Sequence, residues 1–216
     1  MSEPVKSRTY RSSVREEQAR RTRQAILNAA RRLFAEQGYA ATTIAQVARA
    51  AGVAVDTVYA SVRAKPVLFR LLMETAISGT DEAVPALERD YVRVIRTEPD
   101  PARKLALYAQ AVGRIQQRLA PLFQVLHQAA AADAELGALW QEISDRRAAN
   151  MGLLAGELAA TGALRPELTV EQAADVLWSM NSPEFYLLLV GQRGWDPDRF
   201  QQWLAHAWQR LLLRPA

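Results

Sequence analysis

Cysteine is absent from the 216 residues of this chain, so the protein can form no disulfide and offers no thiolate ligand to a metal ion. Histidine is scarce. His127 and His206 are the only two, and because they lie far apart in the sequence we expect no transition-metal site. This composition suits a reducing compartment. We therefore expect a protein that uses no cofactor.

Long apolar runs are also missing. The N-terminus lacks the apolar core of a signal peptide. The most apolar stretches, such as 185-FYLLLV-190, are far shorter than the ~20 residues that a helix needs to cross a bilayer. We expect a cytoplasmic protein without a membrane partner.

Motifs of the common enzyme classes do not occur in the chain. It contains no glycine-rich phosphate loop, no nucleophile elbow and no zinc signature, and no other catalytic grouping is recognisable by its spacing. Half of the residues are hydrophobic, which is enough for a sizeable core. The sequence therefore favours a globular protein that is not an enzyme.

The charges that are present are unevenly distributed. Residues 1–70 contain 13 Lys or Arg against 5 Asp or Glu, whereas residues 71–216 contain 14 against 18. A basic N-terminal third on a mildly acidic remainder indicates that one end of the chain meets a polyanion. Taken alone, the charge is equally well explained by a solubilising tail.

The hydrophobic pattern has a helical period almost throughout, so we predict an all-α fold. The first helix is expected to begin at Ser13, because residues 13–16 match a capping box, and to end at Gly38. Residues 1–12 have no apolar pattern and are predicted to form a flexible basic arm, and residues 95–101 a connector. The other helices are predicted at 43–50, 54–61, from Lys65 onward, and at 101–119, 121–131, 134–160, 169–191 (kinked at Pro183) and 197–213.

The two short helices are predicted to form a helix-turn-helix. The small side chain of Ala48 allows the second helix to approach closely, and Gly52 supplies the positive φ that a reversal within about three residues requires. Val47, Val53 and Val58 are expected to fill the space between the helices. Such a motif places its second helix in the major groove of DNA. A purely structural corner is the alternative, which the position in the basic third disfavours.

The same residues resemble a known family. The run 23-RQAILNAARRLFAEQGYAATTIAQVARAAGV-53, followed by Thr57-Val58-Tyr59, Lys65 and Leu68, resembles the DNA-binding domain of the TetR (tetracycline-repressor-like) family of transcriptional regulators. The resemblance implies a helix-turn-helix domain at residues 13–64 and a helical dimerisation and effector-binding domain at residues 65–216. It implies a ligand-responsive repressor that binds an inverted-repeat operator in double-stranded DNA as a homodimer.

The resemblance also implies which residues meet DNA. Thr42 or Thr43 caps the second helix and also contacts a phosphate, with a cap alone as the alternative. Thr57, Tyr59 and Lys65 contact phosphates too; for Tyr59 the alternative is core packing. From the residues themselves, direct base readout is expected to come either from Val55, touching a thymine methyl group, or from Asp56, accepting a hydrogen bond from cytosine. The remaining expected contacts are Arg49 and Ser61.

The sequence departs from the family pattern at three places. Ala54 stands where a capping serine is common, Ser61 and Val62 where His-Phe is common, and Pro66 where an acidic residue is common. The second helix of the motif therefore lacks a side-chain cap, and Asp56 in its first turn is expected to compensate through the helix dipole.

In the C-terminal two-thirds, polar residues interrupt apolar rows on two helices, and aromatic residues accompany them. This mixture is typical of a small-molecule pocket, although boundary residues or subunit contacts explain each position equally well. The expected pocket residues are Tyr108, Phe123, His127, Trp140, Arg147, Asn150, Trp178 and Asn181.

The last two predicted helices carry more apolar surface than a monomer exposes, so we expect them to form the dimer interface. An internal core is the alternative. The expected interface residues are Phe185, Leu188, Leu189, Phe200, Trp203, Leu204, Ala207, Trp208 and Leu211. A helical protein–protein interaction module without sequence-specific DNA binding is the alternative function of the whole chain.

Overall fold

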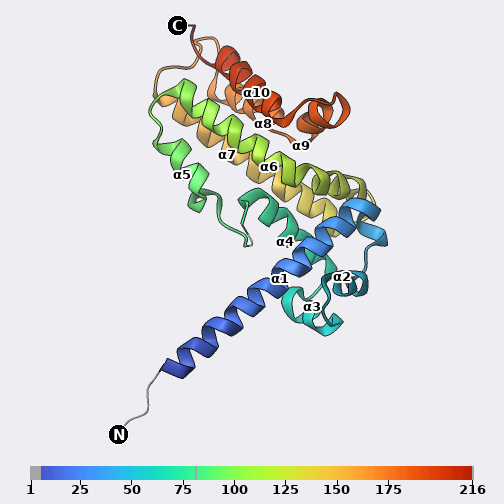
Figure 1. Cartoon of the computed structure of the whole chain (residues 1–216). Helices are drawn as coiled ribbons and strands as arrows, with labels where there is room; N and C mark the ends of the chain where they lie inside the picture. The colour runs from blue at the N-terminus through green and yellow to red at the C-terminus, as the bar shows by residue number, and fades with distance from the viewer. Residues whose placement is uncertain (1–5, 81, 216) are drawn as a thin grey trace. The chain divides into compact units, whose positions relative to one another are not determined.

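The computed structural model of the chain describes residues 6–80 and 82–215, with side chains described from residue 15 onward. These residues form helices and contain no β-strand, which confirms the predicted all-α fold (Figure 1). The elements in chain order are α1 (Lys6–Ala41), α2 (Ile44–Ala51), α3 (Val55–Val62), α4 (Lys65–Ser78), the short 3₁₀-helix η1 (Ala86–Glu88), α5 (Asp90–Thr97), α6 (Pro101–Ala130), α7 (Ala134–Ala160), α8 (Val170–Met180), α9 (Pro183–Tyr186), the π-helix η2 (Leu187–Gln192) and α10 (Pro197–Leu212).

The first helix is longer than predicted. It begins at Lys6 and not at Ser13, because residues 6–12 contain neither glycine nor proline to stop it. The predicted flexible arm is therefore helical from Lys6, and its residues 1–5 lie outside the described residues. At Gly38 the backbone leaves the helix with φ 79° and ψ 175°, a conformation essentially limited to glycine.

Proline has different effects at two positions. Residues 101–130 form one helix, α6, and not the two predicted, because the helix continues through Pro121. An interior proline costs ~3 kcal/mol, which the burial of neighbouring apolar side chains such as Leu119 and Leu122 can offset. Part of the predicted connector at 95–101 is also helical, because α5 extends to Thr97.

The predicted helix 169–191 is broken and not merely kinked. α8 ends at Met180, and Pro183 is the first residue of α9. Between them Ser182 caps α9, because its hydroxyl accepts a hydrogen bond from the Phe185 N–H at 3.0 Å. Asn181 is thereby left outside both helices, with its amide free to face other elements.

The chain divides into two compact units, Met1–Leu72 and Met73–Ala216. The boundary falls inside α4, eight residues later than the predicted boundary between 64 and 65. The cause is aromatic packing. Phe69 of α4 lies edge-on to Phe34 and Tyr39 of the N-terminal unit, with ring centroids 5.0 Å and 5.3 Å apart. The first half of α4 therefore belongs to the core of that unit.

The second unit is built on α6. This helix packs against α10, α7, α9 and α5, and α7 in turn packs against α8. Figure 1 shows α6 and α7 side by side, and they run antiparallel because only residues 131–133 join them. No helix among the described residues is long and apolar enough to cross a membrane.

Candidate nucleic-acid interface and ligand pocket

The turn between α2 and α3 is fixed by backbone hydrogen bonds. Gly52 has φ 68° and ψ 31°, the left-handed conformation that glycine adopts without strain. Its N–H donates to the Arg49 carbonyl at 3.2 Å, and the Val53 N–H donates to the Ala48 carbonyl at 3.0 Å. These two bonds are a Schellman motif, which ends α2 and sets the direction of α3.

The start of α2 has a reciprocal cap. The Thr43 hydroxyl accepts from the Gln46 N–H at 3.2 Å, and the Gln46 side-chain oxygen accepts from the Thr43 N–H at 2.8 Å. Thr42 is placed differently. It is fully buried, its hydroxyl donates to the Gly38 carbonyl at 2.8 Å, and it accepts from Gln37 at 3.2 Å. Thr42 is therefore not available to a phosphate, and of the two threonines only Thr43 is exposed.

One side of α3 is buried and the other is exposed. Val58 and Val62 are buried, which anchors the helix in the unit. On the exposed side Val55 is 40% and Tyr59 48% exposed, so the alternative of core packing does not apply to Tyr59. Asp56 and Ser61 are exposed, Thr57 is half-buried, and Arg49 is exposed at the end of α2. As expected from Ala54, α3 has no side-chain cap.

Lys65 begins α4, where it is held by Tyr39. Its ammonium nitrogen lies 4.2 Å from the centroid of the Tyr39 ring and 3.5 Å from the Ala40 carbonyl oxygen. The backbone between α3 and α4 also has an unusual conformation. Arg63 has φ 58°, which strains a residue with a side chain, and it closes α3 by donating its N–H to the Tyr59 carbonyl at 2.8 Å.

The second unit contains a cavity of about 390 Å³. Its wall comes from the end of α4, from η1 and α5, from α6 and α7, and from α8 and the start of α9. Seven of the eight predicted pocket residues line it: Tyr108, Phe123, Trp140, Arg147, Asn150, Trp178 and Asn181. The eighth, His127, is exposed and is not among the residues that line the cavity. Its ring lies 5.9 Å from the Trp140 ring, measured between centroids.

Asn181 organises the polar part of the cavity wall. Its amide nitrogen donates to the Tyr108 hydroxyl at 2.8 Å and lies 3.0 Å from the Met151 sulfur. Its backbone carbonyl accepts from the Gln116 amide at 2.6 Å. Tyr108 also stacks on Trp208, with centroids 5.3 Å apart, and burial raises the pKa of its hydroxyl above the usual value. The hydroxyl therefore remains a neutral hydrogen-bonding group.

Arg147 is the charged group on the other side of the cavity. Its guanidinium lies 4.7 Å from the centroid of the Trp178 ring. Burial lowers the pKa of Arg147, and the charge of Glu184 partly opposes that effect. Since the ordinary pKa of arginine lies far above neutral pH, the side chain stays charged at neutral pH.

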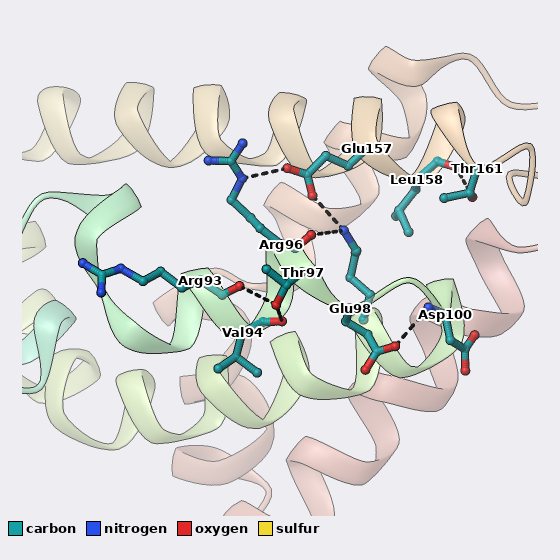
Figure 2. A network of polar contacts seen from close by, with 10 residues as sticks. Arg93, Val94, Arg96, Thr97, Glu98, Asp100, Glu157, Leu158 and Thr161 are labelled. Atoms are coloured by element: carbon teal, nitrogen blue, oxygen red, sulfur yellow. Dashed lines mark hydrogen bonds and ion pairs between the residues drawn. The ribbon is translucent and has the colours of Figure 1, made fainter.

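An ion-pair network joins α5, α6 and α7 at one end of the cavity. Figure 2 shows Arg96 of α5 facing Glu157 of α7, and the two are joined by a 3.1 Å contact. The buried ammonium of Lys104 on α6 donates to the second Glu157 oxygen at 2.9 Å and to the Arg96 carbonyl at 3.4 Å. Glu157 therefore pairs with both Arg96 and Lys104, and these ion pairs connect α5 to α6 and α7.

Two polar residues that line the cavity, Gln116 and Arg146, were not predicted from the sequence. Gln116 is a buried polar residue in the apolar row of α6, so the signal that identified Arg147 and Asn150 could also have identified it. Arg146 gives no such signal. It reaches the cavity because it pairs with Glu74 of α4 at 2.7 Å, a contact that only the tertiary structure creates.

The comparison with known families decides the identity of the N-terminal unit. Residues 26–70, which contain α2, α3 and the turn between them, match the family described as bacterial regulatory proteins, tetR family. This segment is therefore a DNA-binding domain of the TetR type. None of the curated proteins compared with the chain matches it.

Solved structures extend the TetR-family likeness to the whole fold. NalD from Pseudomonas aeruginosa, described as the secondary repressor of the MexAB-OprM multidrug efflux pump, is 28% identical with a TM-score of 0.70, over 93% of this chain and 100% of NalD. A transcriptional regulator from Saccharomonospora viridis, solved with choline, is 18% identical with a TM-score of 0.67, over 89% of this chain and 98% of its own. The fatty acid degradation regulator FadR from Bacillus halodurans is 19% identical with a TM-score of 0.68, over 87% of this chain and 94% of its own.

The second unit exposes an apolar surface on α9, η2 and α10, but not all of the predicted interface residues belong to it. Phe200, Leu204 and Trp208 are fully buried in the core of their own unit, so they are not available to a partner. The helix presents its other side. Trp203 is 39% and Leu211 49% exposed, and the further members of this apolar surface are Phe185, Leu188, Leu189 and Ala207.

Proposed function

We propose that the protein is a ligand-responsive TetR-family repressor that binds an inverted-repeat operator as a homodimer. The observation that carries the proposal is the orientation of α3. Val58 and Val62 anchor this helix, while Val55 and Tyr59 are exposed on its other side. The family match covers the same helix, and helix-turn-helix proteins read the major groove with it.

In the proposed complex, phosphate contacts come from Thr43, Thr57, Tyr59 and Lys65. Val55 meets a thymine methyl group, and Asp56 accepts a hydrogen bond from cytosine. Because the exposed side of α3 carries few hydrogen-bond donors, most of the binding energy comes from phosphates, and the shape of the DNA contributes to specificity.

We expect the affinity for DNA to depend steeply on salt. Titrating the full chain with labelled duplexes from the DNA flanking its own gene, followed by fluorescence anisotropy, should show a loss of roughly 10³–10⁵-fold between 50 and 200 mM salt for six to ten phosphate contacts. An unrelated duplex of equal length is the control. Absence of binding to every flanking duplex even at low salt would instead support a protein-interaction module.

Replacing Lys65 by glutamine should weaken binding to all duplexes by a similar factor and reduce the slope of log affinity against log salt by about one. The reason is that one phosphate contact, and the counterion it releases, is lost. Arg114→Gln is the matched control, because it removes one exposed charge from α6 in the other unit. An unchanged slope for Lys65→Gln, or an equal change for Arg114→Gln, would remove Lys65 from the proposed interface.

Ligand response is proposed to start in the cavity. Ile77 of α4 lines it, and two arginines hold the end of α4 against the same wall, Arg118 through the Ala76 carbonyl at 3.0 Å and Arg146 through Glu74. A ligand that favours one position of this segment shifts the dimer towards a state with the wrong spacing of its α3 helices. The coupling that such a switch needs is ~1–3 kcal/mol. The description of NalD as a repressor supports repression as the output.

A further inference from the structure

Four buried polar atoms in the wall of the cavity have no hydrogen-bond partner among the described residues. They are Nε of Arg147, Nε1 of Trp140, Oε1 of Gln116 and Oδ1 of Asn181. Gln116 and Asn181 are each only 3% exposed, so bulk water does not reach them. An unpaired buried group costs ~1–3 kcal/mol, and such groups are rare. Three further atoms of this kind, Nε of Arg23, Nε of Arg31 and Nε1 of Trp208, belong to residues outside the cavity wall. The four in the wall have almost no accessible surface, so a molecule bound in the cavity can supply their partners once these side chains rotate slightly.

Arg147 determines which charge that molecule carries. No carboxylate among the described residues forms an ion pair with Arg147, whose guanidinium lies over the face of Trp178. Glu184 lines the same cavity and its charge acts on Arg147, but the two side chains are not within ion-pair distance. Two of the other three lining arginines are paired with a carboxylate, Arg146 with Glu74 and Arg96 with Glu157. The third, Arg89, donates to the Val84 carbonyl at 2.9 Å and to the Tyr91 hydroxyl at 3.4 Å. An unpaired guanidinium in an apolar cavity attracts an anion and repels a cation, and its planar geometry matches a carboxylate.

The remaining unpaired atoms define the rest of the ligand. The Trp140 ring nitrogen is a donor and can share the anion with Arg147. The side-chain oxygens of Gln116 and Asn181 are acceptors, so they require a hydroxyl or amide N–H of the ligand. Between these groups the wall is aromatic, with Phe123, Trp140 and Trp178 among its residues. Flat apolar rings fit such a wall.

We propose that the cavity binds an aromatic carboxylate that also carries a hydroxyl or amide donor, a ligand class that rests on the proposed ligand-responsive function. Arg147 and Trp140 hold the carboxylate, and Gln116 and Asn181 accept from the donor. A cationic ligand of the same size should bind more weakly, because the charge of Arg147 repels it.

The first test compares matched probes on the unmodified full chain by isothermal titration calorimetry without DNA. We expect 6-hydroxy-2-naphthoate to bind roughly 10-fold or more tightly than 6-hydroxy-2-naphthamide, because only the former meets the guanidinium with a charge. Removal of the hydroxyl, in 2-naphthoate, should weaken binding roughly 3- to 10-fold. Choline should bind more weakly than any of them. Equal binding of acid and amide, tighter binding of choline, or no binding of either hydroxy probe would overturn the proposal.

The second test removes the charge. Arg147→Met keeps an unbranched side chain against Trp178 and should lower the affinity for 6-hydroxy-2-naphthoate roughly 10- to 100-fold while changing that for the amide less than about threefold. Arg147→Lys keeps the charge without the planar fork and should restore part of the difference. Arg114→Met, which removes a charge outside the cavity, is the control and should change neither affinity. A parallel loss of acid and amide binding in Arg147→Met would indicate a merely structural role.

A DNA-release measurement separates this ligand class from the proposed function. If 6-hydroxy-2-naphthoate binds as expected but does not release the chain from its duplex, the ligand site stands and the proposed ligand response fails. If the chain binds no duplex at all, the calorimetric comparison of acid and amide still decides the ligand class.

Discussion

Replacing Phe69 by alanine is expected to destabilise the N-terminal unit by about 3–5 kcal/mol, the usual cost of removing a fully buried aromatic ring. Phe69 contacts both Phe34 and Tyr39, so the cavity left behind opens the centre of that unit's core. Because a domain of this size has only a few kcal/mol of net stability, most of the variant should lose its N-terminal unit and its affinity for DNA. Thermal unfolding followed by circular dichroism, together with anisotropy, measures both effects.

Phe69→Leu is the matched control for this prediction. It keeps an apolar side chain of nearly the same volume and should cost well under half as much as alanine. The second unit provides an internal reference, because ligand binding in the cavity depends on residues from 77 onward. A Phe69→Ala protein that melts and binds DNA like the unmodified chain would show that α4 does not form part of the N-terminal core.

Placing a carboxylate on the apolar surface of α10 should convert the proposed dimer to a monomer. In the double variant Trp203→Ala, Leu211→Glu, an aromatic anchor is lost and each copy brings a carboxylate into the apolar symmetric contact. Operator affinity should then fall by roughly 10²–10⁴-fold, because the second half-site is no longer bound by a linked second α3. Sedimentation velocity reports the mass and anisotropy the affinity.

Val94→Glu is the corresponding control, since Val94 is an exposed apolar residue of α5 that lies neither in the cavity wall nor on the α10 surface. It should change neither mass nor affinity. The unmodified chain sedimenting as a monomer at micromolar concentration, or the double variant keeping both the dimeric mass and full affinity, would refute the proposed interface.

Trp203 is already restrained before any partner arrives. Its ring stacks on Phe185 with centroids 5.9 Å apart and meets the edge of Trp195 at 5.8 Å, and Arg199 lies 4.1 Å from the Trp195 ring centroid. Burying a side chain whose rotamer is fixed costs less conformational entropy than burying a free one. This favours Trp203 as the central anchor of the proposed interface.

Local sequence signals determined much of this protein. The all-α fold, the limits of α7, the reversal at Gly52 and the uncapped start of α3 all depend on residues close in sequence, through helical period, capping and the positive φ of glycine. Three of the seven predicted residues that line the cavity, Arg147, Asn150 and Asn181, were identified by the same kind of signal, because a polar residue in an apolar row of a helix either meets a cavity or leaves a buried group unpaired. The other four were predicted as the aromatic residues that accompany them.

Contacts between distant residues decided the rest. Whether Thr42 or Thr43 faces outward depends on where Gly38 turns the chain, and the core positions of Phe200, Leu204 and Trp208 depend on which side of α10 packs against α6. An apolar stripe on a helix has the same pattern whether it is covered by its own chain or by a second copy. Likewise, a proline in a helical sequence does not reveal whether the surrounding core is sufficient to carry the helix through it, as at Pro121, or whether the helix ends, as before Pro183. These outcomes follow from burial, and burial is a property of the folded chain.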